Sequence, residues 1–192
     1  MVEGSVVGAA VVATDVVEAV VAVVGPLTGR ASAYGLSQRD GAVLAAEELA
    51  AEAGSLHPGM RLVFADDEAD QTKAGALARD LVARDGVAAF IGAINSDCTH
   101  QIEMVAVKLH VPQLTTASTD PTITDTGSPW IFRCLADDVL QAKAIAVHVF
   151  GEGARRTPRP VALLSQNNRY GRMGIAEVAR AADVAGARIV LQ

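Results

Sequence analysis

RLVFADDEADQTKAGALARDLVARDGVAAFIG, residues 61 to 92, contains two short apolar runs separated by one amphipathic segment. The runs at 61–67 and 87–92 have the length and apolar composition of buried strands. The segment between them has apolar residues on one face of a helix: Ala74, Leu77, Ala78, Leu81 and Val82. Asp70 precedes this helix as a candidate cap, and Gly86 follows it where a glycine commonly ends a helix. The stretch therefore predicts a strand, helix, strand unit of a parallel sheet.

The same alternation continues on both sides of this unit. Further strands are expected at 19–25, 111–118, 161–165 and 187–192, with a short extended crossing at 129–133. Further helices are expected at 36–54, about 99–109, 137–153 and 168–185. We expect Ser37 to cap the first of these helices. Strands that alternate with helices are typical of doubly wound parallel sheets, so the predicted fold class is α/β.

The composition indicates a folded, acidic protein. Of 192 residues, 51% are hydrophobic and 20% are charged, and the formal net charge is -6. The chain has no basic stripe to neutralise phosphates, which argues against nucleic acid and anionic membranes as partners. The apolar N-terminus has no Lys or Arg near its start and carries Glu3, Asp15 and Glu18, so it predicts neither a signal peptide nor a membrane span. Residues 1–17 are treated as an extension of unknown role.

Signs of catalysis or metal binding are weak. Cys98 and His100 are close in sequence, but nucleophile and base pairs usually meet from distant positions, so Cys98 is better explained as a small residue packed at a helix start. The acids at 66–70 resemble a Mg²⁺ site, but that chemistry needs further acids after the first strand, where the chain has GPLTG. A solvated loop with Asp70 as a helix cap is the better explanation.

Common cofactor and metal motifs are also missing from the sequence. It contains no GxGxxG, GxSxG or Walker A pattern, and its histidines and its two cysteines lack metal-type spacing. We therefore predict no enzyme activity, no cofactor and no metal. A disulfide between Cys98 and Cys134 stays open at this point.

Polar residues gather where four of the predicted strands end. They occur in GPLTGRASAYG, ADDEAD, GAINSDCTH and TTASTDP. Ligands of open α/β sheets bind beyond the carboxyl ends of the strands. Hydroxyls and free amides at helix N-termini suit a carboxylate, and carbonyls and hydroxyls suit an ammonium group. The same residue types are also the commonest helix caps and turn formers, so capping is the alternative explanation.

Six segments resemble, in order and spacing, the type I periplasmic binding proteins of the branched-chain amino acid (Leu/Ile/Val) transporter family. They are VVGPLTGRASAYG, LVFADDEADQTKAGALARDLV, FIGAINSDCTHQI, VPQLTTASTDPTITDTGSPWIFR, DDVLQAKAIAVHV and NNRYGRMG. The resemblance covers about residues 19 to 192. It implies two α/β lobes joined by crossing strands, with a free amino acid held between them. An incomplete lobe 1 is then expected at 18–133, and 134–192 is expected to be a partial second lobe that ends after its second strand.

The resemblance also implies ligand-binding residues. Ser96 and nearby amides are expected to bind the ligand carboxylate, while the Ala117 carbonyl and the Thr119 hydroxyl hold its ammonium group. Tyr34 and Tyr170 are expected to line the cleft. For Tyr170 the alternative is an aromatic ring that merely covers a helix start.

Two further positions are compared with the family pattern. Asp138 matches an acidic residue near the hinge. A disulfide common in the family is not expected, because Ala69 and Asn95 occupy its two positions. A second ligand for the ammonium group, usually acidic, belongs to the part of the second lobe beyond residue 192.

The implied function is that of a non-catalytic solute-binding protein, periplasmic or on the cell surface. It captures a small amino acid and delivers it to the permease of an ABC transporter. The alternative is a ligand-sensing receptor or regulator domain for amino acids, short amides or urea. With no signal sequence recognised, the expected location is the cytoplasm if the recorded start is the native one.

Overall fold

The computed structural model describes residues 18–52, 59–150 and 160–191 of the chain. These residues form a five-stranded sheet and a two-stranded sheet, and every strand pair in both is parallel. The α/β fold class predicted from the alternating pattern is therefore confirmed. The extension at 1–17 lies outside the described residues.

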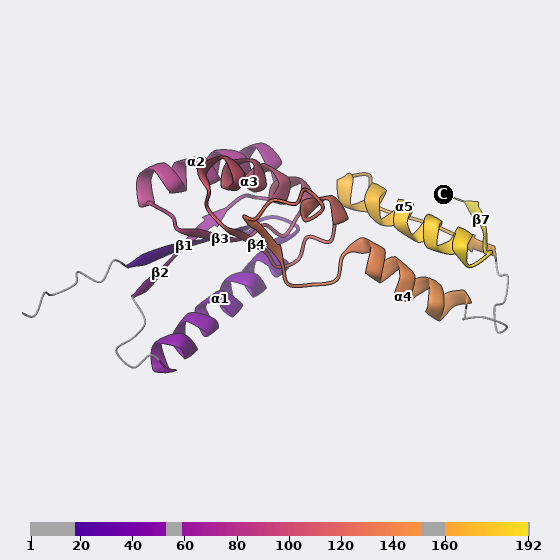
Figure 1. Ribbon diagram of the computed structural model, residues 1–192, viewed down its shortest axis with the longest axis horizontal. Coiled ribbons are helices and arrows are strands. Elements are labelled where there is room, and N and C mark those ends of the chain that lie inside the picture. The colour runs from indigo at the N-terminus through magenta and orange to yellow at the C-terminus, as the bar shows by residue number, and fades with distance from the viewer. Residues whose placement is uncertain (1–17, 53–58, 151–159, 192) are drawn as a thin grey trace, which may run out of the picture.

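The five-stranded sheet and its helices form what we call the larger unit. Its strands are β1 (Ala19–Gly25), β2 (Met60–Asp66), β3 (Ala89–Gly92), β4 (Gln113–Thr115) and β5 (Ile131–Arg133), in the order β2-β1-β3-β4-β5. Helix α1 (Ser32–Glu52) lies against one face, and helices α2 (Gln71–Asp85) and α3 (Ser96–Leu109) cover the other (Figure 1). A 3-10 turn, η1 (Pro121–Ile123), follows β4. Helices on both faces make this sheet doubly wound, as predicted.

The smaller unit follows a short connection at residues 134–137. It consists of α4 (Asp138–Phe150), β6 (Pro160–Ala162), α5 (Arg169–Val184) and β7 (Arg188–Leu191). The two helices pack on each other, and Ala146, Phe150 and Ala182 form the buried core between them and the sheet. Within the described residues its sheet has two strands, β6 and β7, and the division into lobes at 18–133 and 134–192 stays a prediction.

Helix α2 shows how local chemistry fixes the predicted elements. Asp70 accepts hydrogen bonds from the N–H groups of Thr72 (2.8 Å) and Lys73 (2.9 Å), which confirms it as the N-cap. Gly86 ends the helix in the left-handed conformation with φ 63°. The buried face of the helix is formed by Ala74, Gly75, Ala78 and Leu81.

The start of α1 differs from the prediction. The helix begins at Ser32, so Ser37 lies inside it and the prediction that it caps the helix is wrong. Gly35, in the first turn of this helix, packs against the preceding loop. A Cβ on Gly35 would clash with the carbonyl of Pro26, so only glycine allows the helix to approach this loop.

Several other elements also have boundaries different from those expected, as three examples show. Helix α3 begins at Ser96, three residues before the expected start. Strand β4 is limited to Gln113–Thr115, because the hydroxyls of Thr115 and Ser118 turn to carbonyl groups of the neighbouring loop. Strand β6 ends at Ala162 rather than continuing to residue 165.

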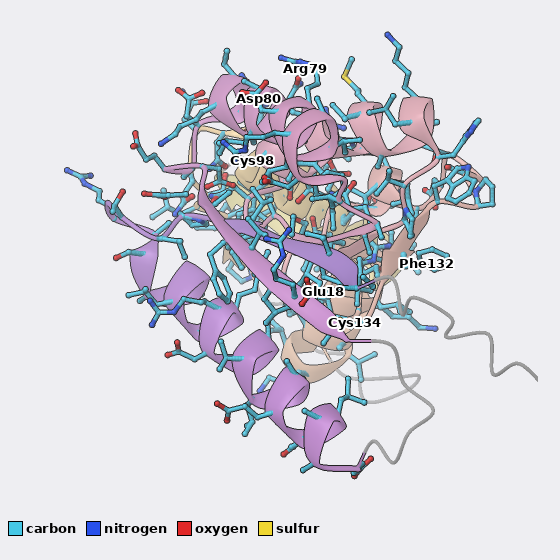
Figure 2. All side chains as sticks on the ribbon, turned by 90° about the vertical axis from the view of Figure 1, so that its left-hand side faces the viewer. Glu18, Arg79, Asp80, Cys98, Phe132 and Cys134 are labelled. Carbon is cyan, nitrogen blue, oxygen red and sulfur yellow. The ribbon has the colours of Figure 1, made fainter. Side chains whose placement is uncertain are left out.

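The two cysteines are both free. Cys98 is buried in α3, among the helices that cover one face of the larger sheet, and Cys134 is exposed after β5 (Figure 2). No disulfide therefore joins them. Among the helices of the described ranges, none has the length and apolar character needed to cross a bilayer.

Candidate ligand-binding site

A cavity of about 480 Å³ lies at the carboxyl ends of β1, β3 and β4 and reaches the start of α5. Its lining residues are Arg30, Ala31, Tyr34, Ile94, Asn95, Ser96, Ala117, Thr119, Gln166, Asn168 and Tyr170. All five residues predicted to bind ligand are in this set. The structure thus brings together Tyr34, Ser96, Ala117 and Thr119 from the larger unit with Tyr170 from the smaller one. This is the edge at which open α/β sheets bind ligands.

Buried polar side chains hold the loop between β3 and α3, which forms the floor of the cavity. The Gln113 side chain donates to the carbonyls of Gly92 (2.9 Å) and Thr99 (3.2 Å). Thr115 donates to the carbonyl of Ala93 (3.2 Å), and Ser118 donates to that of Ile94 (3.0 Å). The polar groups of Gln113, Thr115 and Ser118 therefore stabilise the turn after β3, which is a structural role and not ligand binding.

Asp66 fixes the loop after β1, which supplies Arg30 to the cavity and leads into α1, where Tyr34 lies. Its carboxylate accepts hydrogen bonds from the Leu27 N–H (2.8 Å) and the Thr28 hydroxyl (2.6 Å). Burial opposes ionisation here, but these hydrogen bonds lower the pKa of Asp66. The acid cluster at 66–70 thus has structural tasks, with Asp66 holding this loop and Asp70 capping α2.

Two polar atoms in the cavity wall have no hydrogen-bond partner among the described residues. They are the Thr119 hydroxyl and the side-chain oxygen of Asn95. Thr119 is only 7% exposed, and its hydroxyl lies near the Asp138 carboxylate without reaching hydrogen-bond geometry. Asn95 is the N-cap residue of α3 but makes no capping bond. Buried polar atoms without partners cost free energy, and a polar ligand that bonds to them recovers it.

The start of α3 gives the cavity a positive end. Ser96 is the first residue of this helix and is buried, and the first turn of an α-helix has N–H groups without partners inside the helix. Arg30 is the one charged side chain among the described lining residues. The helix terminus and the guanidinium group together favour an anionic group such as a carboxylate.

The two tyrosines face the cavity from different units. Tyr34 in α1 is 68% exposed, and Tyr170 in α5 is 49% exposed. Tyr170 also lines a second cavity of about 470 Å³, which contains Asp138. Tyr170 therefore contributes to the walls of both cavities.

Asp138 lies behind the cavity, directly after the connection between the units. Its backbone N–H donates to the Thr119 carbonyl (2.8 Å), which ties α4 to the loop after β4. Burial raises the pKa of its carboxyl group. Asp138 therefore supports the position of Thr119 and does not line the cavity.

Sequence reasoning missed several lining residues, notably Arg30, Asn95, Gln166 and Asn168. Asn168 caps α5 by accepting from the Gly171 N–H (2.9 Å), and its amide group donates to Gln166 (3.0 Å). Their positions in the sequence could have indicated them, because each of these residues lies within four residues of a predicted site residue.

The weak catalytic and metal patterns have structural explanations. Cys98 is fully buried, and burial raises the pKa of its thiol, which disfavours the reactive thiolate. Both ring nitrogens of His100 are engaged, Nδ1 with Glu103 (2.8 Å) and Nε2 with Asp120 (3.1 Å). In the described parts of the chain, no group of three or more His, Cys, Asp or Glu side chains is arranged to hold a metal ion.

His100 is expected to make stability depend on pH. Hydrogen bonds to Asp120 and Glu103 raise its pKa from 6.5 to about 9, while the nearby Arg169 opposes this. The stabilisation is therefore complete below pH 6.5 and is lost as pH rises through about 9, by roughly 1–3 kcal/mol. Urea unfolding at about pH 6 and about pH 9.5 measures this loss.

Replacing His100 with glutamine is the control for this expectation. His100→Gln keeps a hydrogen-bonding side chain but no longer titrates, so the pH dependence between these values should shrink. Lys108 and His110 line the same outer cavity as His100 and remain unchanged in the variant. An equal pH dependence in both proteins would assign it to groups other than His100.

Comparisons with known proteins identify the family of this chain. The family model described as periplasmic binding protein matches residues 18–192. The leucine-, isoleucine-, valine-, threonine- and alanine-binding protein of Pseudomonas aeruginosa is 29% identical over 171 residues, covering 89% of this chain and 45% of that protein. The chain thus spans about half the length of the curated relatives it matches.

Solved structures share the fold. A leucine-binding protein from Thermotoga maritima is similar with a TM-score of 0.79 and 26% identity, over 91% of this chain and 48% of that one. A benzoate complex of a solute-binding protein from an R. palustris ABC transporter has a TM-score of 0.80 at 16% identity, over 91% and 47% of the two chains, and shows the fold alone. The resemblance drawn from the six sequence segments is confirmed, and the chain belongs to the periplasmic binding protein family.

Proposed function

We propose that this chain acts as an extracytoplasmic solute-binding protein for a small amino acid of the branched-chain type. The larger and smaller units correspond to two lobes at 18–133 and 134–192, and the ligand binds between them for delivery to the permease of an ABC transporter. The observation that carries the proposal is the cavity at the carboxyl ends of β1, β3 and β4. Residues from both units line it, and two buried polar atoms in its wall have no hydrogen-bond partner among the described residues.

The proposed binding mode assigns one part of the cavity to each end of a zwitterion. The ligand carboxylate binds at the start of α3, where Ser96 and the helix amides are donors. Its ammonium group donates to the Ala117 carbonyl and to the Thr119 hydroxyl. Tyr34 and Tyr170 then cover the ligand from the two lobes. Contacts that form only when both lobes meet the ligand supply the free energy of closure.

We also infer that the chain is not an enzyme. The family is a class of solute-binding proteins, and the Cys98 thiol is too deeply buried to act as a nucleophile. Family membership supports a location outside the cytoplasm and a permease partner. Relatives named for binding leucine, isoleucine and valine support an amino acid as ligand.

Thermal unfolding of the 192-residue chain with and without candidate ligands tests the proposal. L-Leucine, L-isoleucine, L-valine, acetamide and urea form the panel, and two analogues probe the zwitterion. 4-Methylpentanoate is leucine without its ammonium group, and 3-methylbutylamine is leucine without its carboxylate. A ligand at 100 times its Kd adds about 2.7 kcal/mol of stability.

The expected result is a higher melting temperature with a branched-chain amino acid and little or no shift with either analogue. A cooperative melt that no amino acid shifts would contradict the proposal. A shift with acetamide or urea alone would favour the sensor alternative instead.

A further inference from the structure

The chain crosses between the two units once within its described course, through the connection at residues 134–137. Such a short connection fixes the distance between the units but leaves their mutual rotation to side-chain contacts. Helix α5 contacts α3, and the end of α5 nearest the larger unit is its start (Figure 1).

Arg169, the first residue of α5, makes the polar contacts at this junction. Its Nε donates to the Asp120 carboxylate at 2.5 Å, and its Nη2 donates to the Thr122 hydroxyl at 2.9 Å. Asp120 and Thr122 belong to the larger unit, where Asp120 caps η1. Among the residues that the structure describes, both side-chain hydrogen bonds from α5 to the larger unit come from Arg169.

The acceptor side of this contact is built independently of Arg169. Asp120 is fully buried, and Thr122 donates to its carboxylate through both the backbone N–H (3.0 Å) and the hydroxyl (2.7 Å). His100 binds the same carboxylate from α3, and Arg133 donates to the Asp120 carbonyl at 2.7 Å. Burial opposes ionisation, but the bonds from His100, Thr122 and Arg169 keep the pKa of Asp120 far below its usual range. The Asp120 carboxylate is therefore buried and held in position by bonds that do not involve Arg169.

We propose that Arg169 and Asp120 form an interlobe latch, an ion pair that holds the two units in the arrangement that encloses the cavity. Neither residue lines the cavity. The residues on each side of Arg169, Asn168 and Tyr170, do line it, so the latch positions one wall of the cavity without touching the ligand. Arg169 and Asp120 are thus positioning residues for closure and for ligand release. The effect of the latch on ligand release rests on the proposed function, and its effect on the arrangement of the two units does not.

The geometry separates this pair from an ordinary surface ion pair. Exposed pairs contribute little because water competes for both partners. Here the carboxylate has no exposure and the Arg169 side chain has 38%, so water competes mainly at one partner. Removing the guanidinium group leaves Asp120 with His100 and Thr122, so the fold of the larger unit should survive and the interlobe contact should be lost.

The test measures the distance between the units without ligand. Spin labels are placed on Glu47 in α1 and Asp183 in α5, which are both exposed, in a Cys134→Ser background in which the remaining cysteine is buried. Electron–electron double resonance then gives the distance distribution for the wild type, Arg169→Met, Arg169→Lys and the control Arg172→Met. Arg172 is exposed on the same helix, so the control removes the same charge outside the latch.

Arg169→Met is expected to shift the distribution toward longer distances and to lower the ratio of the short to the long population about tenfold, because charge-assisted hydrogen bonds are lost. Arg169→Lys, which keeps the charge without the two-pronged donor, should give an intermediate ratio. Arg172→Met should match the wild type. Unchanged distances in Arg169→Met, or an equal shift in Arg172→Met, would overturn the latch. Circular dichroism checks that each variant is folded. If Arg169→Met does not fold, the distance distribution of Arg169→Lys decides whether the latch exists.

A second measurement uses L-leucine as the probe and separates the latch from the proposed function. The latch predicts a dissociation rate about tenfold higher in Arg169→Met, with a much smaller change in the association rate. An unchanged dissociation rate would contradict a role in release. If the wild-type chain binds none of L-leucine, L-isoleucine and L-valine, the proposed function fails, while the distance measurement still decides whether the latch exists.

Discussion

Replacing Gly92 with alanine is expected to destabilise the larger unit by roughly 3 kcal/mol or more. Gly92 ends β3 with φ 124°, a backbone conformation that L side chains rarely adopt. A Cβ there would also clash with the carbonyl oxygen of Val24, the residue opposite it on β1. The clash cannot be relieved without separating these two central strands, so strain and lost pairing add together.

Gly41→Ala is the matched control for Gly92→Ala. Gly41 is exposed within α1, and a Cβ there would meet nothing within 4 Å. Alanine is the better helix former, so this change should stabilise the chain by up to about 1 kcal/mol. Chemical unfolding of both variants measures the difference. If the free energies of unfolding of the two variants agreed within about 1 kcal/mol, the conclusion that β3 approaches β1 too closely for a side chain at Gly92 would be wrong.

Combining Ser96→Ala with Thr119→Val is expected to abolish ligand-dependent stabilisation while the chain stays folded. Each change removes a hydrogen bond to a charged end of the proposed zwitterion, worth about 1.5–3 kcal/mol. The two losses together correspond to an affinity at least about 100-fold lower. Calorimetric titration with the amino acid that shifts the wild-type melt provides the measurement.

The unliganded stability of Thr119→Val alone gives an independent check. The Thr119 hydroxyl is buried without a partner, so valine of nearly the same shape should leave stability unchanged or raise it. Thr115→Val is the control, because the Thr115 hydroxyl is bonded to the Ala93 carbonyl and its loss should cost about 1 kcal/mol. Full ligand affinity in the double variant would refute the assignment of Ser96 and Thr119.

The parts of the fold predicted best from sequence are those fixed by local chemistry. Strand β1 has the expected bounds, and α2 begins after Asp70 and ends before Gly86, because cap residues act on their immediate neighbours. The start of α1 was missed because the first turn of this helix depends on the close approach of Gly35 to Pro26, and a sequence pattern does not display such a contact.

The candidate site was predictable in position but not in detail. The carboxyl ends of parallel strands share one edge of the sheet, so polar residues after β3 and β4 had to lie close together. Sequence alone does not separate Thr115, whose hydroxyl braces a turn, from Thr119, whose hydroxyl is unpartnered. The pairing of Asp120 with Arg169 was also beyond reach, because it joins residues 49 positions apart in different units.

The bonded floor of the cavity determines where the entropic cost of binding falls. Gln113 is fully buried and holds the loop after β3 through two hydrogen bonds, so this side of the cavity has little freedom left to lose. The two tyrosines are much more exposed and retain rotational freedom until a ligand orders them, at about 0.5–1.5 kcal/mol for each side chain. The rings of Tyr34 and Tyr170, rather than the polar floor, therefore bear most of the ordering that accompanies binding.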